Sequence, residues 1–309
     1  MKLMIDGAWC GDVPEVTAEV AEKVDAHTGD FRGSVTAPER GRYHLYVSYA
    51  CPFAHRVIIG RALKKLEGIV GMSVLQPHWN SPDGWVFGET ALSTLDLAGN
   101  GFTHLHQAFS ISRPDYTGRI TVPILWDRTA RRIVNDQSYE ILFMLNDAFD
   151  GIGAAADIDL HPSSLRAEIL ALSEEIVRSV ALGVYVIGGA QAQDTYDAAV
   201  ATLFETLDSV ERRLADGRAF LHGDAATITD VLLFTPMVRF DAVYNPLFRV
   251  ARRRLVDLPH LFEWTRRFHR LPGVAETVRF DHILRHYYDD WAPRNPRLIP
   301  VLPDRDFRS

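Results

Sequence analysis

Residues 46–56 read YVSYACPFAHR and place one cysteine, Cys51, between an apolar segment and a proline. The alternating apolar segment that ends at Ser48 predicts a strand, and Pro52 suits the first position of a helix that we expect to reach Leu66. Unpaired N–H groups and the dipole at a helix N-terminus favour a thiolate over a thiol. Cys51 is therefore the candidate nucleophile of the chain.

Cys51 lacks the second cysteine of a redox pair, because Ala54 stands three positions later. A Cys-x-x-Cys pair resolves its own mixed disulfide, so here a thiol from outside the protein must do so. The other cysteine, Cys10, lies in a glycine-rich stretch, and we expect it to have no catalytic role. A disulfide between Cys10 and Cys51 stays open at this stage, since its geometry cannot be read from a sequence.

The composition limits the classes of function. The chain has 309 residues, 47% of them hydrophobic, so we expect about two domains with well-packed cores. A net charge of -7 argues against nucleic-acid binding, and no apolar run approaches the roughly 20 residues of a membrane span. We see no signal peptide and only two cysteines, which indicates a reducing cytoplasm.

The first half of the chain alternates predicted strands and helices. Strands are expected at 42–48, 72–75, 120–126 and 131–134, and helices at 54–66 and 137–146. A strand–helix–strand unit followed by a hairpin and a helix is the order of a thioredoxin-like domain. Pro123, inside a predicted strand, indicates an edge position or a cis peptide bond. We divide the chain into an N-terminal arm without regular structure at 1–41, a thioredoxin-like thiol-binding domain at 42–149, and an all-helical domain with a tail at 150–309.

The second half predicts helices only, so the fold class is α/β followed by all-α. Apolar residues at helical spacing mark a first helix across 165–180, and others are expected at 196–214, 247–256, 259–271 and from about Pro272. Thr227 and Asp230 form a predicted capping box at the start of another helix. His282 and His286 have the i, i+4 spacing of metal ligands, but no third ligand accompanies them, so we expect no metal site.

This domain order resembles the glutathione transferase superfamily, and several motifs narrow the resemblance. YHLYVS at 43–48, ACPFAHR at 50–56, GRITVPILWD at 118–127 and IVNDQS at 133–138 resemble the glutathionyl-hydroquinone reductases, also called Xi-class glutathione transferases. VRFDAVY at 238–244, HYY at 286–288, Asn295-Pro296 and Ile299-Pro300 do so as well. The resemblance implies a cysteine-dependent enzyme with glutathione as co-substrate and a homodimeric assembly.

In that family the cysteine attacks the sulfur that joins glutathione to a hydroquinone ring. The hydroquinone leaves, and a second glutathione releases the resulting mixed disulfide as glutathione disulfide. The resemblance thus implies that Cys51 reduces a small aromatic thioether. An omega-type thiol transferase or dehydroascorbate reductase is an alternative with the same cysteine chemistry. A non-catalytic interaction domain is another, although it would have no need of a cysteine at the helix start.

The resemblance also implies which residues bind glutathione. Val122, before Pro123, would offer its backbone to the cysteinyl part of the molecule. Ser138 and the helix start beside Gln137 would hold the γ-glutamyl end. Arg119 would pair with a glutathione carboxylate.

Four aromatic residues complete the implied site. Trp85 would flank the γ-glutamyl end, although a buried Trp that anchors its loop fits the sequence nearly as well. Tyr185, Tyr287 and Tyr288 are candidates for the pocket of the aromatic substrate, because a phenolic hydroxyl can hydrogen-bond a quinol oxygen. Each of these tyrosines could instead be a core residue.

The chain departs from the family pattern at three places. Phe53 stands where Trp is usual, Gln137 replaces a Glu, and Asp290 and Trp291 stand near the position of a usual Ser-His pair. A neutral amide loses a charge-assisted hydrogen bond to the γ-glutamyl ammonium, so we expect weaker glutathione binding. Another low-molecular-weight thiol therefore stays an alternative co-substrate.

Overall fold

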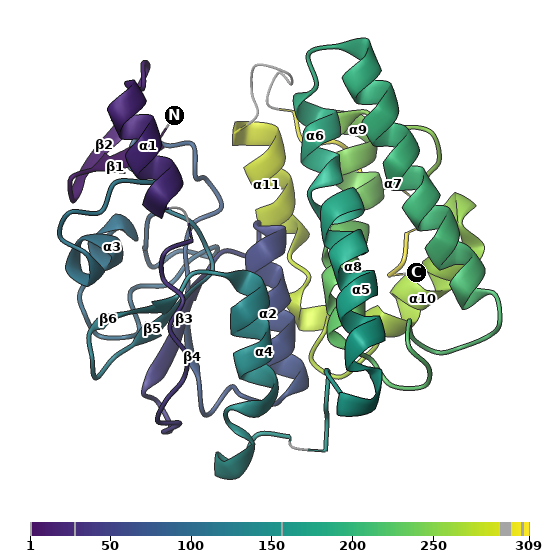
Figure 1. Ribbon diagram of the computed structural model, residues 1–309, viewed down its shortest axis with the longest axis horizontal. Helices are drawn as coiled ribbons and strands as arrows, with labels where there is room; N and C mark the ends of the chain where they lie inside the picture. Colours follow the sequence, from purple (N-terminus) through teal and green to yellow (C-terminus); the bar gives the residue numbers. More distant parts are fainter. Residues whose placement is uncertain (1, 28, 156, 291–297, 304–305, 309) are drawn as a thin grey trace. The chain divides into compact units, whose positions relative to one another are not determined.

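The computed structural model describes residues 2–27, 29–155, 157–290, 298–303 and 306–308 (Figure 1). It divides into two compact units, Met1–Ala156 with Arg279–Asp290 and Asp157–Val278 with Trp291–Ser309. The sequence-based boundary near 150 assigns residues 279–290 to the helical domain, whereas the structure places them in the first unit. The reason is that their side chains bind the loop at 77–80. Trp291 and the Asn295-Pro296 motif lie outside the described residues.

The first unit is built on a four-stranded sheet in the order β4-β3-β5-β6. Its strands are β3 (Tyr43–Val47), β4 (Gly71–Val74), β5 (Ile124–Asp127) and β6 (Arg132–Asn135). β3 and β4 run parallel with α2 (Pro52–Leu63) between them in the chain, and β5 pairs antiparallel with both β3 and β6. The predicted strand–helix–strand unit and hairpin are confirmed. β5 begins only after Pro123, because proline has no N–H to donate to the ladder.

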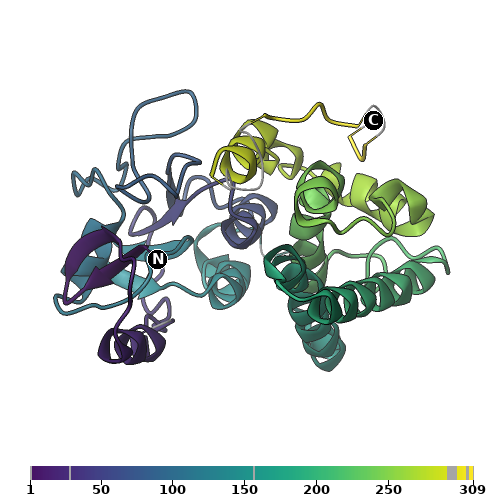
Figure 2. The same cartoon turned by 90° about the horizontal axis from the view of Figure 1, so that it is seen from above.

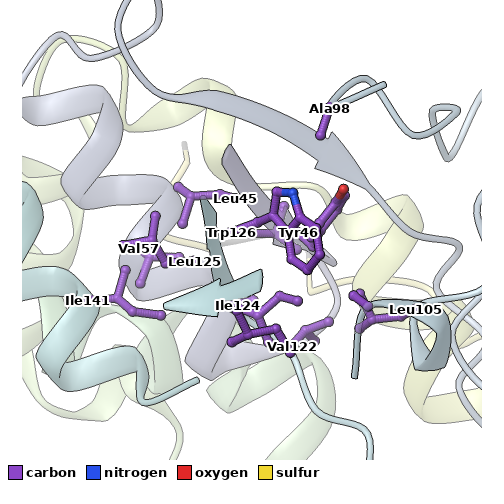
Figure 3. Packing of buried hydrophobic residues seen from close by; sticks show 14 of the residues in the cluster. Leu45, Tyr46, Val57, Ala98, Leu105, Val122, Ile124, Leu125, Trp126 and Ile141 are labelled. Carbon is purple, nitrogen blue, oxygen red and sulfur yellow. The ribbon is translucent and has the colours of Figure 1, made fainter. Parts of the chain in front are cut away.

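The helices of this unit enclose an apolar core with the sheet. α2 and α4 (Ser138–Asp147) pack on each other and lie side by side in Figures 1 and 2, and α3 (His106–Ser112) contacts β6. Figure 3 shows Leu45 and Leu125 of the sheet beside Val57 of α2 and Ile141 of α4, and all four are fully buried. This packing fixes the point at which β3 ends and α2 begins.

The N-terminal residues are ordered, so the prediction of an arm without regular structure is wrong. They form β1 (Lys2–Ile5), β2 (Ala8–Asp12) and α1 (Ala18–His27). The hairpin turns through Asp6 and Gly7, both with positive φ (46° and 78°), as an Asp-Gly turn favours. Met4 also exchanges backbone hydrogen bonds with Gly118, which is distant in sequence. That tertiary pairing stabilises strands that are too short to show a clear pattern of their own.

The second unit consists of helices around one buried helix, α8 (Ile228–Arg239), whose twelve residues are all buried. The other elements are the 3₁₀ turn Ser163–Leu165, α5 (Arg166–Ile176), the π-helical turn Val177–Ala181, α6 (Gly183–Gly189), α7 (Gln193–Leu214), the π-helical turn Phe240–Tyr244, α9 (Asn245–Phe248) and α10 (Pro259–His269). The predicted capping box is confirmed: the Thr227 N–H donates to Asp230 at 2.8 Å. Asp230 also accepts from the Trp264 indole at 2.9 Å, which ties α8 to α10.

Two helix predictions in the last third are wrong or displaced. Instead of a helix at 247–256, α9 ends at Phe248 because the next residue, Arg249, has a φ of +64°, and only a 3₁₀ turn follows at Leu255–Asp257. The intervening arginines leave the helical path to reach partners, as Arg253 does with Asp208. The helix expected near Pro272 is a 3₁₀ turn at Ala275–Thr277, and α11 (Phe280–Asp290) follows it. None of the described helices combines the length and the apolarity that a bilayer span requires.

Candidate active site

Cys51 stands at the junction that the sequence predicts. It is the N-cap residue of α2, with extended backbone angles (φ -76°, ψ 123°), and Pro52 is the first helical residue. The Cys51 carbonyl accepts the first helical hydrogen bond, from the His55 N–H at 2.9 Å. Its side chain is half-buried, and neither Cys51 nor the exposed Cys10 is in a disulfide. The alternative of a Cys10–Cys51 bridge is thereby closed.

The cysteine side chain contacts the turn before β5. Its Sγ donates to the carbonyl oxygen of Val122 at 3.6 Å, and the Val122–Pro123 peptide bond is cis. The sequence-based expectation of a cis bond as one of two options is thus met. No hydrogen bond among the described residues uses the Val122 N–H. A thiol and an available backbone donor therefore lie at one place, which is what an added-strand contact with a cysteinyl ligand requires.

The start of α4 places a hydroxyl group next to a buried cation. Ser138 is the first residue of α4, and its Oγ accepts from Arg56 Nη1 at 3.4 Å. Arg56 is only 3% exposed, and its guanidinium lies 4.7 Å from the centroid of the Phe53 ring. The Arg56 guanidinium adds positive charge at the start of α4, and both this charge and the helix N-terminus favour a bound carboxylate.

Gln137 is paired with a carboxylate that sequence reasoning missed. Its Nε2 donates to Asp136 Oδ1 at 2.6 Å, and burial raises the pKa of the Asp136 carboxyl. The neutral Gln137 amide at the helix start is thus hydrogen-bonded to a carboxyl group. The sequence contains the signal, since Asp136 immediately precedes Gln137, but only the fold shows that the two side chains meet.

Arg119 and Trp85 have contrasting surroundings. Arg119 is exposed, and no hydrogen bond or ion pair of its guanidinium occurs among the described residues, so it is open to a ligand carboxylate. Trp85 is buried, and its ring stacks on His286 of α11 at 6.0 Å with an interplanar angle of 8°. Trp85 thus anchors its loop on α11, which is one of the two roles that the sequence allows. Its other role, flanking the γ-glutamyl end of glutathione, stays a prediction.

α11 reaches the catalytic segment at its N-terminal end. The His282 ring packs edge to face on the Tyr49 ring, with 5.4 Å between the ring centroids. The Arg279 guanidinium lies 5.6 Å from the centroid of the Tyr49 ring. Tyr49 is two residues before Cys51. Burial lowers the pKa of His282 to about 4, so this imidazole is neutral at pH 7. α11 therefore belongs structurally to the unit that carries the nucleophile.

The same helix carries two of the three predicted substrate tyrosines. Tyr287 is fully buried and Tyr288 nearly so, and burial raises the pKa of Tyr288 to about 12. Its phenol is therefore protonated at neutral pH and able to donate a hydrogen bond. Tyr185 lies on α6 in the second unit, where it packs edge to face on Tyr244 and Phe248.

The two histidines with metal-ligand spacing serve packing. His282 packs on Tyr49, and His286 Nδ1 lies 2.8 Å from the Pro77 carbonyl oxygen. Within the part of the chain that the structure describes, no three His, Cys, Asp or Glu side chains come together as metal ligands.

Comparisons with known proteins agree with this arrangement. The family profile "Glutathione S-transferase, N-terminal domain" matches residues 50–148, and "Glutathione S-transferase, C-terminal domain" matches 193–267. The chain is 38% identical over 310 residues to the glutathionyl-hydroquinone reductase PcpF of Sphingobium chlorophenolicum, covering 98% of this chain and 96% of the relative. It belongs to the glutathionyl-hydroquinone reductase family, within the glutathione S-transferases.

Solved structures of this family have the same fold. An Xi-class glutathione transferase from Natrialba magadii superposes with a TM-score of 0.92 at 38% identity, covering 100% of this chain and 96% of the other. The glutathione-bound structure of YqjG from Escherichia coli gives 0.88 at 37% identity, covering 99% and 97%. The family resemblance and the two-part fold class predicted from the sequence are therefore confirmed.

Proposed function

We propose that this protein reduces S-glutathionyl hydroquinones to free hydroquinones, with glutathione as the second thiol. The observation that carries the proposal is the Cys51 thiol at the start of α2, 3.6 Å from the Val122 carbonyl oxygen. A nucleophilic thiol without a resolving cysteine suits a reaction in which the conjugate supplies one glutathionyl sulfur and a free glutathione molecule from solution supplies the second thiol. Relatives that are named glutathionyl-hydroquinone reductases, and one bound to glutathione, support the choice of substrate.

In the first step the Cys51 thiolate attacks the glutathionyl sulfur of the conjugate. A sulfur–sulfur bond forms, the bond between sulfur and the ring carbon breaks, and its electron pair leaves with the ring, which takes up a proton. The ring is reduced by two electrons, and the two thiols are oxidised to a mixed disulfide. In the second step a glutathione thiolate attacks that disulfide, giving glutathione disulfide and restoring the Cys51 thiolate.

The surrounding residues bind the two ends of glutathione. The Val122 backbone aligns the cysteinyl part, and Arg119 pairs with a carboxylate. Ser138, with Arg56 behind it, holds the γ-glutamyl carboxylate at the start of α4. Gln137, with Asp136 attached to its amide, faces the ammonium group. Because Asp136 supplies a charge that the sequence appeared to lack, ordinary glutathione is the thiol that we propose, rather than a substitute.

The aromatic residues serve the hydroquinone and the rim of the site. Tyr287 and Tyr288 of α11 are the candidates for the ring pocket. The protonated phenol of Tyr288 is suited to donate a hydrogen bond to a quinol oxygen and so to stabilise the negative charge on the leaving ring. Trp85 flanks the γ-glutamyl end.

We also propose that the enzyme acts in the cytoplasm as a homodimer. Neither Cys10 nor Cys51 is in a disulfide, which suits that compartment. The dimer follows from the family resemblance, and analytical ultracentrifugation of the purified protein tests it: a single species at the monomer mass at micromolar concentration would reject it.

The reaction is tested by product stoichiometry. A purified S-glutathionyl hydroquinone and glutathione are incubated with the enzyme, and the products are separated by chromatography. The proposal predicts one free hydroquinone and one glutathione disulfide for each conjugate consumed. Turnover of dehydroascorbate or a simple dialkyl disulfide without any conjugate turnover would favour the omega-type alternative instead.

A further inference from the structure

The loop that carries Trp85 is held to the last turn of α11 by one carboxylate. Asp290 Oδ2 accepts from the backbone N–H of Trp79 at 2.9 Å and from that of Asn80 at 3.3 Å. The Asn80 side chain returns a hydrogen bond to the Asp290 carbonyl oxygen at 3.1 Å. Three hydrogen bonds thus join residues that are 210 or more positions apart in the chain.

His286, one helical turn earlier, holds the same loop at two further points. Its Nδ1 lies 2.8 Å from the Pro77 carbonyl oxygen. Because a carbonyl oxygen only accepts, this nitrogen carries the hydrogen. The ring of His286 also stacks on Trp85. Asp290 and His286 therefore fix both the beginning of the loop and the tryptophan within it.

The position of Asp290 is costly for the helix itself. An acid in the last turn of a helix is opposed by the negative end of the helix dipole, and burial raises the pKa of this carboxyl. Its side chain is 7% exposed; the Nδ1 of His78 lies 3.5 Å from its Oδ1, and the Nδ1 of His286 lies 3.7 Å from its Oδ2. The adjacent Asp289 is 28% exposed and lies 3.8 Å from His78. Of the two acids, only Asp290 has its side chain in the interior, where it binds the loop.

We propose that Asp290 is a positioning residue that joins the loop at 77–85 to α11, so that Trp85 and the Tyr287–Tyr288 pair form one wall of the active site. Asp290 itself touches neither substrate. The identity of what this wall binds rests on the proposed function. The family pattern has a Ser-His pair near this position. The Asp290 carboxylate is therefore a feature of this chain, and it fixes the position of the loop.

The test compares Asp290→Ala and Asp290→Asn with Asp289→Ala as the matched control. We measure kcat and KM for the conjugate, glutathione affinity by calorimetry, and the rate at which iodoacetamide alkylates Cys51. Asp290→Ala is expected to lower kcat/KM about 10- to 100-fold and to weaken glutathione binding, since small displacements of a site wall cost that much. The alkylation rate should stay within about twofold of wild type, because the β3–α2 turn is unchanged.

Rescue separates positioning from general stability. Asp290→Asn keeps one acceptor oxygen for the Trp79 N–H and should recover a large part of the loss, and Asp289→Ala should behave as wild type. Wild-type kcat/KM and glutathione affinity in Asp290→Ala would overturn the proposal. So would a parallel loss of Cys51 alkylation without rescue by Asn, which would mean that the acid only keeps the protein folded. If the wild type turns over no conjugate, the proposed function fails, while the calorimetric comparison still decides the role of Asp290.

Discussion

The Sγ of Cys51 lies 3.6 Å from the carbonyl oxygen of Val122, a residue 71 positions further along the chain. The contact joins the end of β3 to the start of β5, two strands that pair antiparallel in the centre of the sheet. The nucleophile therefore lies beside the two central strands of the first unit's sheet. A ligand whose backbone pairs with Val122 would bring its own sulfur to that of Cys51.

Replacement of Cys51 by alanine should abolish the reductase reaction. The chain offers no second thiol at this helix start, so the variant should retain less than about a hundredth of wild-type kcat/KM. Circular dichroism and thermal unfolding should match the wild type. Cys10→Ala is the matched control, because that thiol is exposed on β2, and it should keep full activity. Substantial turnover in Cys51→Ala would exclude the covalent mechanism.

The Cys51 thiol should ionise below the value of about 8.5 that a free cysteine shows, because the N-terminus of α2 stabilises the thiolate. A Cys10→Ser background leaves Cys51 as the only thiol to report. The rate of iodoacetamide alkylation is then measured against pH. A midpoint at or above the value of free cysteine would contradict the expected activation by the helix.

The contact between Gln137 and Asp136 changes what a carboxylate at position 137 would do. From the sequence alone, Gln137→Glu should tighten glutathione binding by restoring a charge-assisted hydrogen bond. In the structure the new carboxylate would stand at hydrogen-bond distance from Asp136, so repulsion should offset most of the gain.

The double variant Gln137→Glu with Asp136→Asn removes that repulsion. It should bind glutathione at least about fivefold more tightly than Gln137→Glu alone, and Asp136→Asn alone should bind it more weakly than wild type. Calorimetry measures all four proteins. Equal affinities throughout would show that neither side chain faces the γ-glutamyl ammonium.

The central elements of the fold could be predicted because each has a local signal. The β3 pattern with Pro52 after Cys51, and the Thr227–Asp230 capping box, depend on neighbours in sequence. The β1–β2 hairpin was missed because its strands are short and its stability depends on Gly118. The helix expected at 247–256 failed for a similar reason, since Arg249, Arg252 and Arg253 contact side chains of α7.

The candidate site shows the same division. Cys51 and the Val122–Pro123 turn each have a local sequence signal, and in the structure the Cys51 Sγ lies 3.6 Å from the Val122 carbonyl oxygen. The contacts of Asp136 and Asp290 could not be predicted from the sequence, because the role of a carboxylate depends on the groups that the fold places beside it. The partners of Asp290 lie more than two hundred residues away in sequence.

The stability of the first unit should fall as the pH is lowered from about 6.5 to about 4. His44 of β3 is buried, its Nε2 lies 2.7 Å from Ser73 Oγ, and burial lowers its pKa to about 4. In this window the unfolded chain binds a proton at His44 and the folded chain does not, so the free energy of unfolding rises with pH. The slope is at most about 1.4 kcal/mol per pH unit for each such group.

His44→Gln keeps a hydrogen bond to Ser73 but does not titrate. Urea unfolding of this variant between pH 4 and 6.5 should show a shallower dependence on pH than the wild type. His282, which is also in the first unit and whose pKa burial also lowers to about 4, should maintain part of the slope. An unchanged slope would mean that His44 is not held neutral by burial.

The intact mass of the protein tests the central claim most directly. The enzyme is mixed with a stoichiometric amount of S-glutathionyl hydroquinone, without free glutathione, and the reaction is quenched with acid. The account predicts a mass increase of one glutathionyl group, located on Cys51 by peptide mapping, present in Cys10→Ser, absent in Cys51→Ser, and removed by added glutathione. An unmodified protein that has nevertheless released hydroquinone, or an adduct on Cys10 alone, would contradict it.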